Sequence, residues 1–509
     1  MRSKLIHRLR NNPRGWLTDA FPICKWLPKY QISDIPYDML AGVTLGLTIL
    51  PLALAYAQMC YMRAEYGLYS AFLAAFVYIF IGTSKDAIIA PTAISSMLLA
   101  QFNVHDPLYM SGDNTYGAIL AMTNGIVLVL MGVFKLGFIV NLFSIPVVSG
   151  FTSASAFAIT ASQLKTIFGI KKGPNDSPGV FIKQIMNIYQ RRSEIQIIDV
   201  TFGFASLAFL LGVEYAHVIF LQFILPRFPK PKSDRGLRIQ ENFLKALQLL
   251  VRSRNVILFI TATGISYAIY SSNPEEMQNK MTVVGYVKPG FPIPSFPKFQ
   301  VTNRTMVAVN TSSGIVYEEQ EVVLQSMGDI FSGLSIGLFI MPLMAVMEMM
   351  AILKALGRKN GYRIDPTQEL IAVGLGNFFQ SFIGAIPVTA ATAKTALNDQ
   401  CQVRSQLSAF VRIAIVLISI GTLTHIFFYV PKPALSAILI AAAHHLFDYH
   451  TVSSNSLKLY HSIIFVVNNF IVRLFRCGKN TNPIWACFSL HFYYVYFSIW
   501  PMELLLPFY

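Results

Sequence analysis

Apolar segments separated by short, mostly basic loops run through this 509-residue chain. A helix needs about 20 predominantly apolar residues to cross a bilayer. The first group of candidate spans lies near residues 37–57, 66–82, 87–101, 118–134, 147–163, 197–225 and 256–270. The second group lies near residues 329–353, 369–383, 387–397, 409–429, 432–446, 462–474 and 483–508. The pattern predicts an all-α polytopic membrane protein with seven spans followed by seven, in which the third span of each group is unusually short.

The two short spans share a proline followed by small and hydroxyl-bearing residues. Pro91 precedes Thr92 in the first, and Pro387 precedes Thr389 in the second. Interrupted segments at matching places in two halves are typical of transporters built from inverted repeats. The free N–H groups and the dipole of a half-helix favour an anion at its N-terminus, and Lys394 adds a cation nearby. The pattern therefore predicts an anion site between broken third and tenth helices.

Composition agrees with a membrane protein and argues against a nucleic-acid-binding role. Hydrophobic residues make up 54% of the chain and charged residues 13%, whereas a soluble domain carries about 25% charged residues. The net charge of +15 comes from basic residues in short loops, which is the bias that orients membrane proteins. We therefore expect the lipid bilayer, and no nucleic acid, as a partner. The five cysteines show no metal or redox spacing, so no cofactor and no metal is expected.

The loops predict the orientation and the domain organisation. Basic residues dominate the loop at 227–254, whereas the loop at 271–325 carries N-glycosylation patterns at Asn303 and Asn310. Because basic loops stay cytosolic, we expect the N-terminus inside and both glycosylation sites outside, in the plasma membrane or a lysosomal or other endomembrane. The expected parts are a cytosolic segment at 1–36, a first repeat at 37–270, an extracytosolic loop at 271–325, a partial second repeat at 326–450 and an atypical hydrophobic tail at 451–509.

Several blocks spaced along the chain resemble one known family. They are Leu50–Ala57, Tyr66–Ser70, Gly82–Asp86, Pro91–Ala93, Gly150–Ala154, Gly361–Asp365, Pro387–Thr389 and Tyr429–Lys432. Taken in this order, the blocks resemble the sulfate permease and sulfate–anion solute carrier family, and within it the sodium-independent sulfate anion transporter branch of animals. The likeness runs from about residue 21 to residue 450.

The resemblance implies both a fold and an activity. The family has fourteen membrane segments in a seven-plus-seven inverted repeat, divided into a mobile core domain and a gate domain. It forms homodimers and carries a cytosolic STAS domain after the last span. A member is expected to be a secondary-active transporter of inorganic anions and not an enzyme. Sulfate is the first expected substrate, beside chloride, bicarbonate or oxalate, moved by elevator-like exchange or uniport.

The resemblance also places the substrate between the third and tenth segments, with contributions from the first and eighth. The expected substrate-binding residues are Leu52, Tyr56, Pro91, Thr92, Ala93, Thr392, Ala393, Lys394 and Thr395. Two of them depart from the family pattern, because Leu52 stands where Gln is common and Lys394 where many members have Arg. Lysine keeps the charge but loses the bidentate fork of arginine. The change favours smaller or less directional anions such as chloride or bicarbonate.

Each of these residues also has a structural interpretation. Tyr56 donates its hydroxyl to an oxyanion or packs in the core, and Lys394 faces the site or extends to the cytosolic interface. Glu348 is a lone acid in the eighth span, where an acid is a functional hypothesis by default. It binds sodium, accepts a coupling proton, or forms a structural pair with Lys394. His444 and His445 resemble a metal dyad, but without a third ligand packing is the preferred interpretation.

Two other functions stay open. A proton-coupled nucleobase-type carrier has the same fold, although Lys394 argues against it because such carriers place carboxylates in the tenth segment. The second alternative is a truncated, non-transporting product that associates with a full-length partner. The tail at 451–509 motivates it, because the resemblance is expected to end near Thr451 and nothing beyond resembles a STAS domain.

Overall fold

The computed structural model describes residues 21–108, 114–137, 145–170, 181–224, 240, 243–244, 247–272, 280–311, 314–444 and 446. The chain divides into two compact units. One comprises residues 1–142 with 155–445, and the other comprises residues 143–154 with 446–509. The candidate site belongs to the first unit, whereas the expected tail at 451–509 lies outside the described residues.

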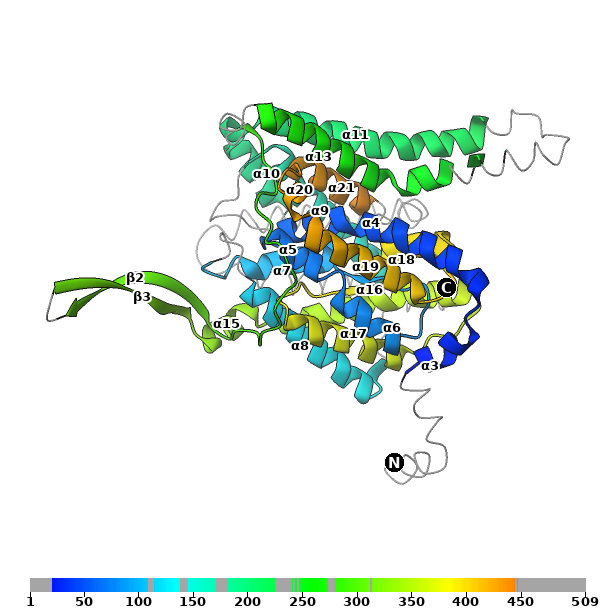
Figure 1. The fold of residues 1–509 in the computed structure, drawn as a ribbon, viewed down its shortest axis with the longest axis horizontal. Coiled ribbons are helices and arrows are strands. Elements are labelled where there is room, and N and C mark those ends of the chain that lie inside the picture. The colour runs from blue at the N-terminus through cyan, green and yellow to red at the C-terminus, as the bar shows by residue number, and fades with distance from the viewer. Residues whose placement is uncertain are drawn as a thin grey trace, which may run out of the picture. The chain divides into compact units, whose positions relative to one another are not determined.

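Helices dominate the described residues (Figure 1). In the first half they are α3 (Ile23–Trp26), α4 (Ile35–Met59), α5 (Ala64–Tyr69), α6 (Leu73–Ile81), α7 (Ala93–Asn103), α8 (Thr115–Val133), α9 (Ile145–Ile167), α10 (Phe181–Gln190), α11 (Ile197–Ile219) and α13 (Arg254–Ser272). In the second half they are α15 (Met327–Leu334), α16 (Gly337–Lys359), α17 (Pro366–Ser381), α18 (Thr392–Gln400), α19 (Leu407–Thr422), α20 (Thr424–Phe427) and α21 (Lys432–His444). The strands are β1 (Ile89–Ala90), β2 (Val301–Thr311), β3 (Gly314–Gln325) and β4 (Thr389–Ala390).

Six helical segments in the described part of the chain are long and apolar enough to cross a membrane. They are Ile32–Met59, Ala64–Ile81, Thr115–Val133, Ile197–Ile219, Arg254–Ser272 and Gly337–Lys359. Two shorter apolar helices, α19 and α21, follow them. The prediction of a helical polytopic fold is confirmed, and both short spans consist of a two-residue strand followed by a short helix.

The span expected at 329–353 is instead two helices. α15 ends at Leu334, and α16 begins at Gly337 and continues to Lys359. Glycine and serine, which are weak helix formers, alternate across the break at residues 332–337. A single apolar run therefore contains a break between two helices that its mean hydropathy does not reveal.

The loop expected at 271–325 contains a β-hairpin that the pattern of spans did not predict (Figure 1). β2 pairs antiparallel with β3, from Val301 opposite Gln325 to Thr311 opposite Gly314. The two glycosylation patterns begin at Asn303 and Asn310, which both lie on β2. The predicted acceptor sites are thus carried by one strand of this hairpin.

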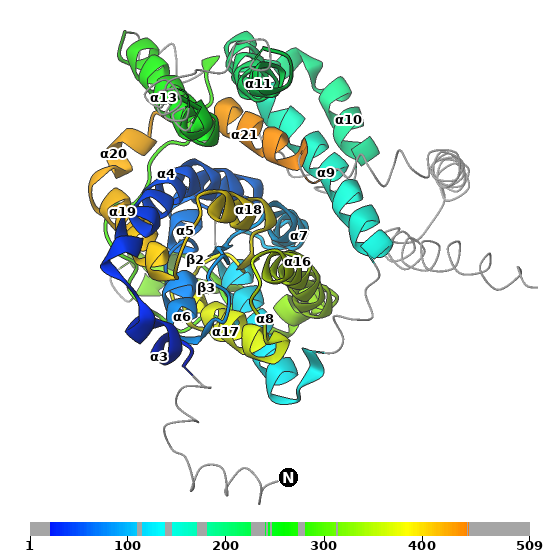
Figure 2. The same cartoon turned by 90° about the vertical axis from the view of Figure 1, so that its right-hand side faces the viewer.

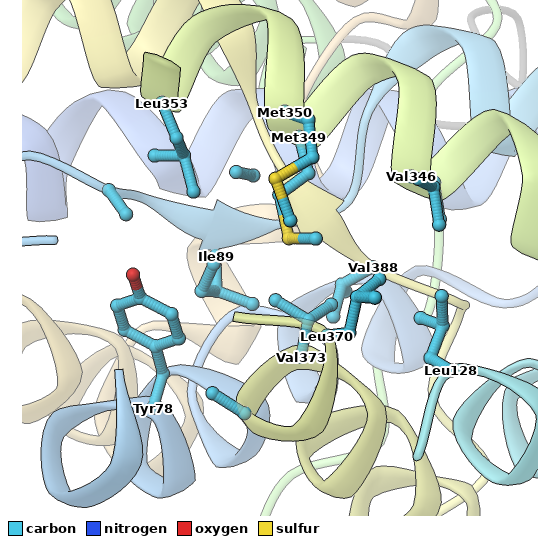
Figure 3. Close-up of a cluster of buried hydrophobic side chains, with 14 of the residues drawn as sticks. Tyr78, Ile89, Leu128, Val346, Met349, Met350, Leu353, Leu370, Val373 and Val388 are labelled. Carbon is cyan, nitrogen blue, oxygen red and sulfur yellow. The ribbon is translucent and has the colours of Figure 1, made fainter. Parts of the chain in front are cut away.

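The two shortest strands pair with each other inside a buried apolar cluster. β1 and β4 are antiparallel, with Ile89 opposite Ala390 and Ala90 opposite Thr389. Helix α16 packs on one side of the pair and α17 on the other, as Figure 3 shows. The side chains around the pair include Met349, Met350, Leu353, Leu370 and Val373. The pair joins the two broken segments that the sequence places in separate halves.

Side chains satisfy the extended backbone that leads into β4. Asn377 of α17 donates to the carbonyl of Val388 (2.8 Å) and accepts from its N–H (2.9 Å). Gln380 donates to the carbonyl of Ile386 (2.8 Å), and the N–H of Ile386 donates to Ser70 Oγ (2.7 Å). Non-helical backbone is tolerated at membrane depth only when its polar groups find such partners. These bonds therefore allow the tenth segment to stay extended before α18 begins.

Helix α4 packs closely against α19 because glycines line the contact. A Cβ atom on Gly42 would come within 2.6 Å of Val411 Cβ, and one on Gly46 within 3.3 Å of Arg412 Cα. Small residues allow this close approach between membrane helices. α4 also contacts α5, α7, α13, α18 and α21, and Figure 2 shows it between the helices around β1 and β4 and the helices α13 and α21. It is the element through which the two groups of helices in this unit meet.

The second group consists of α11, α13 and α21. α11 packs against both α13 and α21. Large apolar side chains on α11 and α13 stay exposed, among them Phe204, Phe209, Ile260 and Ile265. An exposed apolar surface of this kind suits helices that face lipid.

Candidate functional site

The starts of α7 and α18 meet beside the pair of short strands. The N–H of Ala391 donates to the carbonyl of Ile88 (2.9 Å), and the N–H of Ile88 donates to Thr395 Oγ1 (3.1 Å). These bonds extend the pairing at the end where β1 begins and β4 ends. As a result, Thr92 and Ala93 at the start of α7 and Thr392 and its neighbours at the start of α18 belong to one region.

The start of α7 is closed by its own side chains. Thr92 is the N-cap, and its hydroxyl accepts from the N–H of Ser95 (3.3 Å), while Ser95 Oγ accepts from the N–H of Thr92 (3.3 Å). This reciprocal arrangement is a capping box, which satisfies N–H groups that a helix start otherwise leaves free. Pro91, Thr92 and Ala93 are all buried. The N–H groups of Thr92 and Ser95 at the start of α7 therefore have partners within the first broken segment.

The start of α18 is open by comparison. Its N-cap is Ala391, which provides no side-chain hydrogen bond to the described helix. Thr392 is partly exposed and Ala393 is exposed, although Ala391, Lys394 and Thr395 are buried. The first N–H groups of a helix have no partner within the helix. An anion at this place would meet these N–H groups and the positive end of the helix dipole.

Lys394 lies inside the protein. Its side chain is 5% exposed, its Nζ donates to the carbonyl of Pro91 (2.7 Å), and Nζ lies 4.7 Å from the centre of the Tyr56 ring. A cation over a tyrosine face is held electrostatically. Tyr56 and Leu52 are buried on α4. The structure thus brings first-, third- and tenth-segment residues together around Lys394.

Glu348 lies on α16 near the start of α7. Its Oε2 accepts a hydrogen bond from Thr92 Oγ1 (2.9 Å), and it lines a small cavity of about 10 Å³ together with Ser95, Asn124 and Thr389. Glu348 and Lys394 attract each other through space. Among the described residues, however, their hydrogen bonds lead to Thr92 and to Pro91 and not to each other. The direct structural pair that the sequence allowed is therefore absent from this part of the chain.

Arg412 and Glu369 are among the buried charges that the sequence analysis did not single out. Arg412 of α19 is among the most buried large side chains. Glu369, at the start of α17, accepts from Tyr78 Oη (2.8 Å) and from the N–H of Thr83 (2.8 Å). Both residues lie within or beside expected apolar spans, where an ionisable side chain is a signal by itself. Glu369 joins α17 to the turn after α6 through these bonds.

The paired histidines contribute no metal site to the described structure. His444 shares a hydrogen bond with Tyr215 Oη (3.3 Å), while His445 lies outside the described residues. The described residues include no group of three or more His, Cys, Asp or Glu side chains able to hold a metal ion. His444 therefore has a packing role in this structure.

Apolar helices around two broken segments, whose starts meet beside a buried cation, define a multi-pass membrane transport protein. Residues 35–467 match the Sulfate permease family, and the chain belongs to this family. Its members are transporters and not enzymes. The match continues past residue 451, so the expectation that the likeness ends near that position is corrected.

Individual relatives agree with this assignment. A protein of Bos taurus named sodium-independent sulfate anion transporter is 31% identical over 439 residues, which cover 85% of this chain and 66% of that protein. Murine solute carrier 26 family member A9, an anion transporter in the inward-facing state, matches with a TM-score of 0.69 at 22% identity, over 88% of this chain and 66% of that one.

A more distant neighbour covers the membrane part alone. The transmembrane domain of the cyanobacterial bicarbonate transporter BicA matches with a TM-score of 0.61 at 16% identity, over 88% of this chain and 99% of that chain. At such identities the structural matches concern the fold. The chain spans between 44% and 66% of the length of the first curated relatives it matches.

Proposed function

We propose that this chain moves inorganic anions across a membrane by secondary-active transport. Sulfate is the first substrate, and chloride, bicarbonate or oxalate are further ones. The anion binds between the starts of α7 and α18. Exchange or uniport follows from an elevator-like displacement of the helices around β1 and β4 past α11, α13 and α21.

One observation carries the proposal: a buried lysine stands at the start of an uncapped half-helix. Lys394 is 5% exposed, and α18 lacks a side-chain cap within the described chain. A full positive charge and backbone N–H donors therefore converge on one place, which is the arrangement that binds anions. Family membership supports the class of activity, and the positive charge at this site supports an anion as the substrate.

The ammonium group of Lys394 has donors to spare for a substrate. A lysine provides three N–H donors, and one of them goes to the carbonyl of Pro91. The Tyr56 ring holds the ammonium group in place, and Leu52 adds an apolar wall on the same helix. We assign to Thr392, Ala393 and the remaining residues of this region the backbone contacts of the anion.

Three further parts of the proposal concern the rest of the chain. Glu348 couples or gates transport, because it is a partly buried acid that bonds to Thr92, next to the Pro91 carbonyl to which Lys394 bonds. The β2–β3 hairpin lies outside the membrane and is glycosylated at Asn303 and Asn310. The transporter acts as a homodimer.

Uptake of radiolabelled sulfate by cells that express this chain tests the proposal. Uptake is measured with and without chloride on the opposite side, for the parent chain and for Lys394→Ala at matched surface level. Lys29→Ala is the matched control, because Lys29 is exposed and lies before the first span. We expect saturable uptake that Lys394→Ala lowers at least tenfold and Lys394→Arg restores in part.

Two results would contradict the proposal in different ways. Equal uptake by the parent and by Lys394→Ala would reject the anion site at α18 but not the transport activity. Absence of saturable uptake of sulfate, chloride, bicarbonate and oxalate, despite surface expression of the parent, would reject transport itself. Stimulation by opposing chloride would identify exchange, and indifference to it would identify uniport.

A further inference from the structure

An asparagine is buried in the middle of α8 with an unused hydrogen-bonding atom. Asn124 is 2% exposed, and within the described chain its Oδ1 atom has no hydrogen-bond partner. Burying a polar group without a partner is costly, above all at membrane depth, where no bulk water reaches it. Buried polar atoms in folded proteins almost always bond to protein or to an ordered water. Asn124 therefore calls for a small ligand.

The packing of α8 keeps Asn124 inside the protein. A Cβ atom on Gly125 would lie 2.5 Å from the backbone N of Phe378, and one on Gly132 would lie 2.5 Å from Ile371 Cγ1. Both neighbours belong to α17, so α8 and α17 are in close contact at two levels. α8 also packs against α7 and α16. Because these contacts fix the rotation of α8, Asn124 cannot turn its amide toward lipid.

Asn124 shares a small cavity with Glu348. The polar lining of this cavity consists of Asn124 of α8, Ser95 of α7, Glu348 of α16 and Thr389 of β4. The volume open to the centre of a water molecule is about 10 Å³, which corresponds to about one water position. An oxyanion such as sulfate does not fit. Size therefore limits the occupant to one water molecule or an ion no larger than water.

The lining offers acceptors and needs a donor. Asn124 Oδ1 is an acceptor, and so is the Glu348 carboxylate, whose Oε2 accepts from Thr92 Oγ1 (2.9 Å). The Thr389 hydroxyl donates to a backbone carbonyl of α16 (2.9 Å), and the Ser95 hydroxyl donates to the carbonyl of Thr92 (3.2 Å). Both hydroxyl hydrogens are therefore used within the protein. A water molecule carries two hydrogens and can donate one to the amide oxygen and one to the carboxylate.

We propose that Asn124 and Glu348 hold one water molecule between them, and that Asn124 is a positioning residue that acts on Glu348 through this water. The inference rests on the proposed function, which assigns coupling or gating to Glu348. The water and Thr92 hold the carboxylate by two hydrogen bonds, next to the Pro91 carbonyl that accepts from Lys394. Helix α8, which carries none of the expected site residues, is thereby connected to the site.

Two variants remove the water in different ways. Asn124→Leu replaces the amide by an apolar group of similar shape. Ala345→Val leaves Asn124 in place and adds two methyl groups to the wall of the cavity, which Ala345 also lines. Asn124→Ser keeps a hydroxyl and leaves room for the water. Thr123→Val is the matched control, because Thr123 is the neighbour of Asn124 on α8 and its hydroxyl bonds to carbonyls of its own helix.

Sulfate uptake at matched surface level is the first readout. We expect Asn124→Leu and Ala345→Val to lower kcat about tenfold and to change KM less than about twofold, because Glu348 loses a hydrogen bond while Lys394 still binds the anion. Asn124→Ser should keep most of the kcat, and Thr123→Val should match the parent. Replacement of Na⁺ by K⁺ should leave the uptake of the parent unchanged.

A cryo-EM map of the parent protein, at a resolution that shows ordered waters, is the second readout. We expect a density peak within hydrogen-bond distance of Asn124 Oδ1 and of the Glu348 carboxylate, and we expect this peak to be missing in Asn124→Leu. If Ala345→Val does not reach the surface, the peak and the kcat of Asn124→Ser decide. A peak together with a retained kcat then supports the inference.

Several results would overturn the inference. A map of the parent without a peak in this cavity would do so, and so would a normal kcat in Ala345→Val. A purely structural role for Asn124 would lower both Tm and kcat in Asn124→Leu and leave Ala345→Val like the parent. Uptake that requires Na⁺ would identify a cation in the cavity instead of water.

Failure of this inference is distinguishable from failure of the proposed function. A parent chain that transports no anion rejects the proposed function. An active parent whose kcat is unchanged in both Asn124→Leu and Ala345→Val rejects only the role of Asn124 and its water.

Discussion

Helices α7 and α18 follow similar sequences, and the strands that precede them, β1 and β4, pair with each other. The N-termini of the two helices are nevertheless capped differently. At α7, Thr92 caps its own helix and is buried. At α18, the corresponding hydroxyl of Thr389 donates to the carbonyl of Ala345 (2.9 Å) instead, and Ala391 stands at the N-cap. Within the described chain, one helix start has a side-chain cap and the other has none.

The two similar segments differ in the groups that they provide near Lys394. The capped start of α7 fixes the position of Pro91, whose carbonyl accepts a hydrogen bond from Lys394 Nζ. The uncapped start of α18 carries the charge and the free donors. Variants that exchange these properties should therefore have opposite effects on stability and on anion affinity.

Removing the cap of α7 should cost the most. In Thr92→Val the helix loses its N-cap and Glu348 loses a hydrogen bond, so we expect about 2 kcal/mol less unfolding free energy. Denaturant unfolding in detergent measures it. Thr123→Val is the control, because the Thr123 hydroxyl bonds only to carbonyls of its own helix. Equal losses of unfolding free energy in both variants would show that the cap of α7 contributes no more to stability than an ordinary threonine hydroxyl in a helix.

Adding a charged cap to α18 should weaken the binding of the substrate and leave the stability of the fold unchanged. In Ala391→Asp the new carboxylate takes the free N–H groups and repels an anion. We expect the KM for sulfate to rise about tenfold, which corresponds to about 1.4 kcal/mol. Ala391→Asn adds a cap without a charge and should raise the KM about threefold. A KM in Ala391→Asp no higher than in Ala391→Asn would mean that no anion approaches this helix start.

Cutting the bond between the two segments should have a moderate effect. Thr395→Val removes the hydroxyl that accepts from the N–H of Ile88, which leaves a buried donor unsatisfied at a cost of about 1 kcal/mol. The Tm in detergent measures the loss. Thr395→Ser keeps the hydroxyl and should unfold like the parent, so a Tm as low as that of Thr395→Val would point to packing instead.

The mildest change is a neutral hydroxyl cap on α18. Ala391→Ser should increase the unfolding free energy by about 0.5 kcal/mol, because serine is a good N-cap and alanine a poor one. The same hydroxyl competes with the anion, so the KM for sulfate should rise about twofold. A variant that is both more stable and a tighter binder would contradict the assignment of these N–H groups to the substrate.

The sequence predicted the helical spans and both broken segments because these depend on local features. The length of an apolar run determines whether a helix can cross a bilayer, and Pro91 and Pro387 mark the interruptions. The break between α15 and α16 was missed, since the apolar run continues through it. The pairing of β1 with β4 was missed as well, because two residues carry no recognisable strand pattern.

The candidate site was predicted only in part because tertiary contacts complete it. Lys394 was predicted from its place after a broken segment, and its burial beside Tyr56 agrees with that prediction. Its bond to the carbonyl of Pro91 depends on the pairing of the two halves and has no sequence signature. Arg412 did carry a signal, since it is a charge within the apolar span at 409–429. Its burial was missed because it depends on the packing of α19 against α4 and α6.

The bond between Ile88 and Thr395 joins residues 307 positions apart, and this separation has a consequence for how the protein is made. At about 5–20 residues per second, synthesis of the second partner follows the first by about 15–60 s. During that time the backbone of β1 lacks its native partner inside the membrane, where unsatisfied polar groups are costly. The partly synthesised chain is therefore the form of this protein that most needs protection by the insertion machinery or by membrane chaperones.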